Sequence, residues 1–257
     1  NKDKAIIVGA GIGGLASSLR LSHLGYDVKV IERANGAGGK LRTITGSTGE
    51  IDIGPTVLTL LPIFQKLFKS VGEDIFEHVD LVRQKIIARH WWPDGTSLDL
   101  HDDFETSRDA IMKFSGSSSA IEFEKYFCDT RDLFACFDLP VMQNPRPSIL
   151  DMNRAVLSNP KILPKMHPLR TLSSLLNYKF QDIRLRQLFG RYATYVGGSP
   201  LESPALLSLV WQAEAQGVWS IKGGMRKLAR VIEQLAKARG ASFNYGTDIR
   251  EFNTKGD

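Results

Sequence analysis

The residues with the clearest chemical meaning stand near the start of the chain, in the run GAGIGG at positions 9–14. Its first, third and sixth residues are glycines with the spacing of a turn that binds a dinucleotide. The first glycine permits the tight turn, the second lets the backbone approach the pyrophosphate, and the third lets a helix pack on a strand. The partly positive N–H groups that open such a helix attract the pyrophosphate.

Two strands and a helix must hold that turn. Residues 5–8 predict a short buried strand, and residues 14–24 carry leucines at helical spacing, ended by Gly25. Residues 27–32 predict a second strand that ends on Glu32, 23 positions after Gly9. A carboxylate there accepts hydrogen bonds from ribose hydroxyls and disfavours the extra phosphate of NADP. A glycine-rich loop without a ligand is the alternative, but a strand, a helix and an acid in register favour the dinucleotide.

Two later segments favour FAD over NAD. Residues 32–42 (ERANGAGGKLR) form a double-glycine loop flanked by cations, and residues 52–56 (DIGPT) follow soon after. Together they resemble the FAD-binding signature of the flavoprotein group that contains amine oxidases and carotenoid desaturases. The resemblance implies that the double glycine and the base after it line the pyrophosphate and ribityl chain. It also implies that Gly54-Pro55 lies along the flavin ring, although an ordinary turn would explain that pair alone.

In this signature Lys40 replaces the more usual arginine, so attraction to phosphate is retained with looser geometry. The residues expected to contact FAD are Gly9, Ala10, Gly11, Ile12, Gly13, Gly14, Glu32, Arg33, Gly38, Gly39, Lys40, Leu41, Gly54, Pro55, Thr56 and, as a contact to adenine, Ile249.

The rest of the chain narrows the resemblance. Residues 54–59 (GPTVLT), 191–200 (RYATYVGGSP) and 217–225 (GVWSIKGGM) are similar, in the same order, to segments of the bacterial-type carotenoid (phytoene) desaturase family. Residues 88–95 (ARHWWPDG) and 209–214 (LVWQAE) are most similar to the branch that acts on 1-hydroxy or methoxy carotenoids. The resemblance covers essentially all 257 residues.

The family implies an FAD-dependent oxidoreductase that introduces a carbon–carbon double bond into a carotenoid by hydride transfer to flavin. The electron acceptor would be a quinone or oxygen. Tyr192, Tyr195 and Trp219 are candidates for contact with the substrate, although ordinary core aromatics are at least as good an interpretation. The residues predict no general base.

The expected fold is α/β. A Rossmann-like FAD-binding domain, with a βαβ unit and a mostly parallel sheet, is interrupted by a mixed, largely helical domain that faces substrate and membrane. We expect the first FAD-binding segment at residues 1–82, the insert at 83–216 and the returning segment at 217–257. Because such a sheet needs strands beyond the one expected at 242–245, we expect the N-terminal half of a longer protein.

Composition and charge limit the partners. No apolar run reaches the roughly 20 residues that span a bilayer, and two cysteines, Cys128 and Cys136, suit reduced thiols in a cytoplasmic protein. Five scattered histidines lack metal-ligand spacing, so no metal site is predicted. We expect a cytoplasmic protein at the surface of the inner, photosynthetic membrane.

That expectation also draws on a basic segment. Between Arg146 and Arg191 nine bases face two acids, Asp151 and Asp182, within the segment, with apolar residues interleaved. An anionic membrane surface would bind such a pattern, whereas no nucleic-acid motif accompanies it. A solvated basic face is an equally favoured alternative.

Three other functions stay open. The chain could be an amine oxidase of the same flavin group, or a non-enzymatic lipid carrier on the same scaffold, like the Rab escort proteins. It could also be a neighbouring carotenoid enzyme, such as a phytoene desaturase, an isomerase or an oxygenase.

Overall fold

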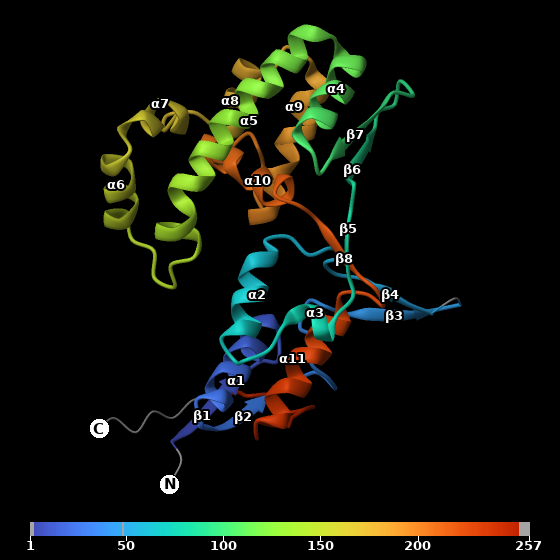
Figure 1. Ribbon diagram of the computed structural model, residues 1–257, viewed down its shortest axis with the longest axis vertical. Helices are drawn as coiled ribbons and strands as arrows, with labels where there is room; N and C mark the ends of the chain where they lie inside the picture. Colours follow the sequence, from blue (N-terminus) through green and yellow to red (C-terminus); the bar gives the residue numbers. More distant parts are fainter. Residues whose placement is uncertain (1–2, 48, 252–257) are drawn as a thin grey trace. The chain divides into compact units, whose positions relative to one another are not determined.

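The computed structural model describes residues 3–47 and 49–251, and the chain divides into two compact units (Figure 1). One unit, here called the outer unit, contains the residues up to Arg83 and those from Val218 onward. The other, the middle unit, contains Gln84–Gly217. The chain therefore leaves the outer unit and returns to it later.

The outer unit contains a parallel sheet with the strand order β1-β2-β9, formed by β1 (Lys4–Val8), β2 (Asp27–Ile31) and β9 (Ser242–Asn244). Helix α1 (Ile12–His23) connects β1 to β2 and packs beside α11 (Arg226–Ala238), as Figure 1 shows. Leu15 and Leu19 of α1 are fully buried. The expected α/β Rossmann-like fold with a βαβ unit is confirmed.

One detail of that prediction is wrong. Strand β1 was expected to be buried, but Ile6 and Val8 are 67% and 51% exposed. The reason is that β1 is an edge strand of the described sheet, and its alternate side chains point away from the core.

Shorter elements complete the outer unit. Strands β3 (Thr43–Gly46) and β4 (Gly49–Asp52) form an antiparallel pair, and α2 (Leu61–Lys69) and α3 (Ile75–His78) follow. Strand β5 (Leu81–Arg83) pairs antiparallel with β8 (Trp219–Ile221), so the outgoing and returning segments share a ladder.

The middle unit is mostly helical. Strands β6 (Ile86–Trp91) and β7 (Ser97–His101) form a hairpin, and the helices are α4 (Phe104–Ser115), α5 (Ser117–Phe137), α6 (Ile149–Ser158), α7 (Leu163–Met166), α8 (Leu172–Lys179), α9 (Ile183–Gly190) and α10 (Gln212–Ala215). Tight 3-10 turns at Arg191–Val196 and Ala205–Trp211 connect the last of these. Its core is aromatic: Phe123, Phe189 and Trp211 lie within 6.0 Å of one another, centroid to centroid.

The middle unit also changes the interpretation of the basic segment. Lys165 lies 2.6 Å from Asp132, and Lys179 lies 2.6 Å from Asp129, both acids being on α5. Arg191 pairs with Glu214. These carboxylates lie outside residues 146–191, so a count of charges within that segment overstated the positive charge that it leaves unpaired. No helix among the described residues is long and apolar enough to cross a membrane.

Candidate nucleotide-binding site

The glycine turn after β1 folds back tightly on itself. Gly9 has a φ of +90°, which L side chains rarely adopt. A Cβ on Gly14 would stand 2.0 Å from the Gly9 carbonyl oxygen, so helix and turn touch through backbone. Gly11 is the N-cap residue of helix α1, and within the described residues no side chain caps this N-terminus and no acid occupies its first turn. Its first N–H groups are thus available to an anion.

Glu32 holds this turn in place. Its carboxylate accepts the N–H group of Ala10 at 2.6 Å and that of Ala34 at 2.8 Å. Partial burial acts to raise the pKa of Glu32, but the N–H donors and the charge of Arg33 outweigh it and lower the pKa. An ionised carboxylate is therefore kept at the end of β2, where a ribose would be recognised.

Three predicted segments come together at the turn. Gly38 donates its N–H to the Ala10 carbonyl at 2.8 Å, and a Cβ on Gly39 would meet the Cα of Gly11 at 2.8 Å. A Cβ on Gly54 would stand 1.9 Å from the Lys40 carbonyl oxygen. Glycine is thus required at these positions by close backbone approach.

A pocket of about 490 Å³ opens where these segments meet. Seven predicted residues line it: Gly11, Ile12, Gly38, Gly39, Lys40, Leu41 and Pro55. The remaining predicted residues do not: Gly9, Ala10, Gly13, Gly14, Glu32, Arg33, Gly54, Thr56 and Ile249. Of these, Gly9, Ala10, Gly14 and Glu32 shape the turn, and Ile249 lies beyond β9 in irregular chain.

The predicted contact residues do not include the mostly apolar wall of this pocket, although residues 54–59 were already noted as similar to a segment of the family. Val57, Leu58, Phe64, Met225 and Leu228 build this wall, together with Thr59. Met225 ends the segment Lys222-Gly223-Gly224-Met225, whose resemblance to the family was the signal that could have placed it here. The glycine backbones, the Lys40 cation and the open end of α1 fit a pyrophosphate, and the apolar wall fits a flat ring.

The three candidate substrate residues fall into different units. Trp219 lies in β8 of the outer unit, with the Arg83 guanidinium 5.7 Å from the centre of its ring. Tyr192 and Tyr195 belong to the middle unit, where both hydroxyls donate to the carboxylate of Glu214. Burial, and then the Glu214 contact, raises the pKa of Tyr195 to about 12. Burial, and then the charge of Glu214, raises the pKa of Tyr192 as well, so neither tyrosine ionises near neutral pH.

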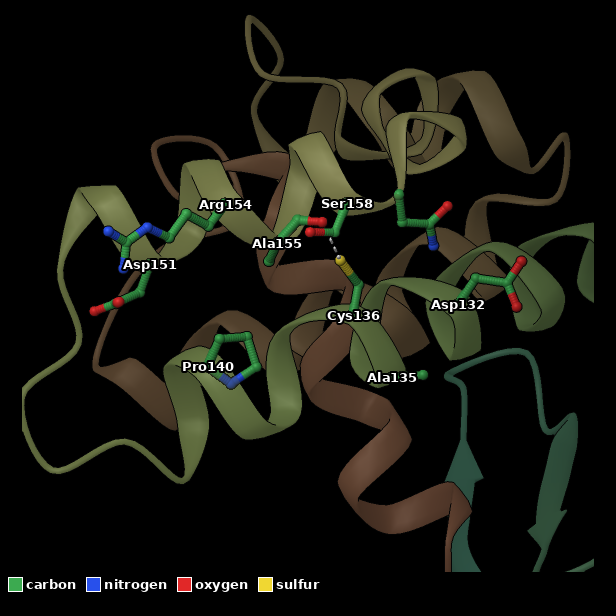
Figure 2. A pocket seen from close by; sticks show the side chains of 9 residues that line it. Asp132, Ala135, Cys136, Pro140, Asp151, Arg154, Ala155 and Ser158 are labelled. Carbon is green, nitrogen blue, oxygen red and sulfur yellow. Dashed lines mark hydrogen bonds between the residues drawn. The ribbon is translucent and has the colours of Figure 1, made fainter.

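A second pocket, of about 530 Å³, lies between α5 and α6 (Figure 2). Cys136 contacts the Ala155 carbonyl across it at 3.7 Å, and Arg154 and Asp132 also line it. Burial raises the pKa of the Cys136 thiol, which keeps it in the unreactive form. None of the sequence-predicted site residues lines this pocket.

The fold and the glycine-lined pocket define a Rossmann-like nucleotide-binding protein with a largely helical middle region. Residues 7–73 match the NAD(P)-binding Rossmann-like domain. The fold is also that of an oxidoreductase from Methanosarcina mazei (TM-score 0.62, 19% identity, 95% of this chain and 51% of that one). A putrescine oxidase matches similarly (TM-score 0.61, 18% identity, 95% and 51%).

Along nearly its whole length the chain is homologous to hydroxyneurosporene desaturases. That of Cereibacter sphaeroides is 42% identical over 98% of the chain, and that of Rhodobacter capsulatus is 41% identical over 97%. A 4,4'-diapolycopene oxygenase from Methylomonas sp is 27% identical over 98% of the chain. The chain spans about half the length of these relatives, 51%, 51% and 50% respectively.

Proposed function

We propose that this chain is part of an FAD-dependent carotenoid desaturase that acts on a 1-hydroxy or methoxy carotenoid. The observation that carries the proposal is the pocket where Gly11, Gly38, Gly39 and Lys40 meet at the open end of α1. Homology to hydroxyneurosporene desaturases supports the reaction and the substrate class. We assign cofactor binding to the outer unit and contact with substrate and membrane to the middle unit.

In this proposal each part of the pocket binds a different part of the dinucleotide. The α1 N-terminus and Lys40 bind the pyrophosphate by charge, because no side chain caps the first N–H groups of α1 in the described structure and Lys40 places a cation in the pocket lining. Glu32 orients the ribose, and Pro55 and the apolar wall exclude water from the flavin end. When bound, FAD would supply the hydride acceptor for removing two hydrogens from adjacent carbons, with a quinone or oxygen as the final oxidant.

Purification with a bound flavin, followed by pigment analysis in a carotenoid-accumulating host, tests the proposal. We expect a flavin absorbance spectrum and one additional double bond in the hydroxylated carotenoid. Lys40→Gln should weaken FAD binding by about tenfold, as expected for a lost charge-assisted contact. Lys29→Gln on the exposed side of β2 is the matched control and should not. Protein that binds no flavin would refute the proposal.

The same pigment analysis separates the nearest alternative. An oxygenated carotenoid would favour the reaction named for the Methylomonas relative, and an unchanged pigment pool with bound lipid would favour a carrier. An intact glycine-lined pocket argues against a carrier, because a protein that only holds a lipid chain does not need a dinucleotide cradle.

Helix α6 supports the membrane part of the proposal. None of its residues is buried, and Ile149, Leu150 and Leu157 are 74%, 68% and 79% exposed. Arg154 lies on the same helix, where its charge acts on Asp151, and Lys161 follows just beyond the helix end. Exposed leucines beside cations are what an interfacial helix presents to anionic lipid.

Co-sedimentation with vesicles containing anionic lipid tests this assignment. Leu150→Glu together with Leu157→Glu should reduce the bound fraction several-fold, since two inserted side chains become charged. Leu24→Glu is the control, because Leu24 is similarly exposed (70%) but lies in the outer unit. Equal loss of binding in both proteins would contradict docking through α6.

A further inference from the structure

A polar cluster lies against the aromatic core of the middle unit. Three segments separated in sequence supply it: residues 88–95 contribute His90, residues 191–200 contribute Arg191, Tyr192 and Tyr195, and residues 209–214 contribute Glu214. Two of these segments, 88–95 and 209–214, are those whose sequences distinguish the branch acting on hydroxylated carotenoids. The fold thus brings together the residues that sequence alone marked as branch-specific.

The carboxylate of Glu214 has hydrogen-bond donors on both of its oxygens. Its side chain is only 7% exposed, and it accepts from the Arg191 guanidinium at 2.6 Å and the Tyr192 hydroxyl at 2.7 Å. The Tyr195 hydroxyl donates to its other oxygen. Charge and hydrogen-bonding capacity are therefore balanced on this side of the cluster.

At His90 and at the Nε atom of Arg191, by contrast, the side-chain hydrogen-bonding capacity of the cluster is not used within the described residues. Arg191 Nε and His90 Nε2 are both buried, and neither has a hydrogen-bond partner within the described structure. The two residues interact electrostatically. Burial, and then the positive charge of Arg191, lowers the pKa of His90, so its ring is neutral at pH 7. A neutral ring beside a cation favours the tautomer in which Nε2 is an acceptor.

A buried donor and a buried acceptor on two interacting residues, both without a partner in the described structure, could be satisfied by one chemical group, a hydroxyl. The hydroxyl of an alcohol accepts one hydrogen bond and donates another, so it would accept from Arg191 Nε and donate to His90 Nε2. The Trp92 ring lies 6.1 Å from that of His90, and the charge of Asp99, which pairs with Arg89, also acts on His90. Tyr195, which is 52% exposed, extends the cluster to the surface of the middle unit.

We propose that His90 and Arg191 bind the hydroxyl group at the end of a long isoprenoid chain, and so select hydroxylated over unhydroxylated carotenoids. This inference rests on the proposed function, because it takes the ligand to be a carotenoid. It adds which residues recognise the hydroxyl. Glu214 acts through Arg191, because their ion pair at 2.6 Å holds the guanidinium in place.

Direct binding measurements test the proposal without relying on turnover. Quenching of tryptophan fluorescence in FAD-loaded protein gives the Kd for hydroxyneurosporene and for neurosporene, both supplied in detergent micelles. We expect the hydroxylated ligand to bind at least about tenfold more tightly, because a site with buried polar groups rejects a ligand that leaves them unpaired. His90→Phe removes the acceptor with a ring of similar shape and should bring the two Kd values within about twofold.

Two further variants keep the test decisive. Arg191→Lys retains the charge beside Glu214 but has no Nε–H, so it should also lower the preference even if His90→Phe does not fold. His101→Phe alters a histidine on β7 outside the cluster and should leave the preference intact. A wild-type preference near one, or a preference unchanged in both His90→Phe and Arg191→Lys, overturns the proposal. A protein that shows the preference but desaturates nothing would instead refute the proposed reaction and retain the hydroxyl site.

Discussion

A methyl group added at Gly14 tests the architecture of the nucleotide turn most directly. The new Cβ would stand 2.0 Å from the Gly9 carbonyl oxygen and 3.1 Å from its carbon, whereas ordinary contacts begin near 3.4 Å. The obstacle is backbone that cannot rotate away, so α1 and the turn must separate. Overpacking of this kind costs about 1–3 kcal/mol. The better helix propensity of alanine returns only about 0.5–1 kcal/mol, so Gly14→Ala should lower the free energy of unfolding.

Gly13 provides the matched control one residue away in the same helix. A Cβ there meets nothing within 4 Å and Gly13 has no positive φ, so Gly13→Ala should be neutral or stabilising by up to about 1 kcal/mol. Urea unfolding of the two variants, followed by far-ultraviolet circular dichroism without added nucleotide, isolates folding from any effect on the ligand. If Gly14→Ala proves as stable as Gly13→Ala, the close contact between helix and turn is wrong.

Three further predictions concern carboxylates and a histidine. Glu32 has a lowered pKa in the folded state, so its ionised carboxylate stabilises the fold at pH values above its pKa in the unfolded chain. This stabilisation is lost as the pH falls, so Glu32→Gln should flatten the pH dependence of the free energy of unfolding below about pH 4.5. Burial and the charge of Arg191 also lower the pKa of His90 in the folded state, so as the pH falls this histidine is protonated in the unfolded chain before it is protonated in the folded one. Stability should fall as pH drops below about 6.5, and His90→Phe should remove that slope. Asp52→Ala removes the acceptor of the Met225 N–H at the start of α11, which should cost about 0.5–2 kcal/mol by chemical denaturation.

Much of the outer unit could be predicted because its signals are local. The glycine spacing, the leucine period of α1 and Gly25, whose φ of +91° ends that helix, all act within a few residues of one another. All of these local signals predict the same strand–turn–helix unit, which makes the prediction reliable. The glycine turn was therefore predicted between the strand and the helix where the structure has it.

What could not be predicted depends on contacts between distant segments. Nothing in the sequence around Lys165 and Lys179 shows that Asp129 will face both, because that proximity arises when α5 packs beside later helices. The same holds for Glu214, whose partner Arg191 lies 23 positions earlier across two tight turns. The net charge counted along a segment describes its electrostatic environment only when the ion-pair partners lie in the same segment.

The apolar wall of the nucleotide pocket shows how far this dependence reaches. Asp52 accepts the Met225 N–H at 2.9 Å, and a Cβ on Gly224 would meet the same carboxylate at 2.9 Å. Met225 lines the pocket, and Gly54, two residues after Asp52, is pressed against Lys40. One short segment thus positions the cation on one side of the pocket and the start of α11 on the other. That helix belongs to the returning part of the chain, so during synthesis the pocket can form only after the whole middle unit has been made. A variant in which the two segments of the outer unit fail to pack together should therefore also lose affinity for the nucleotide.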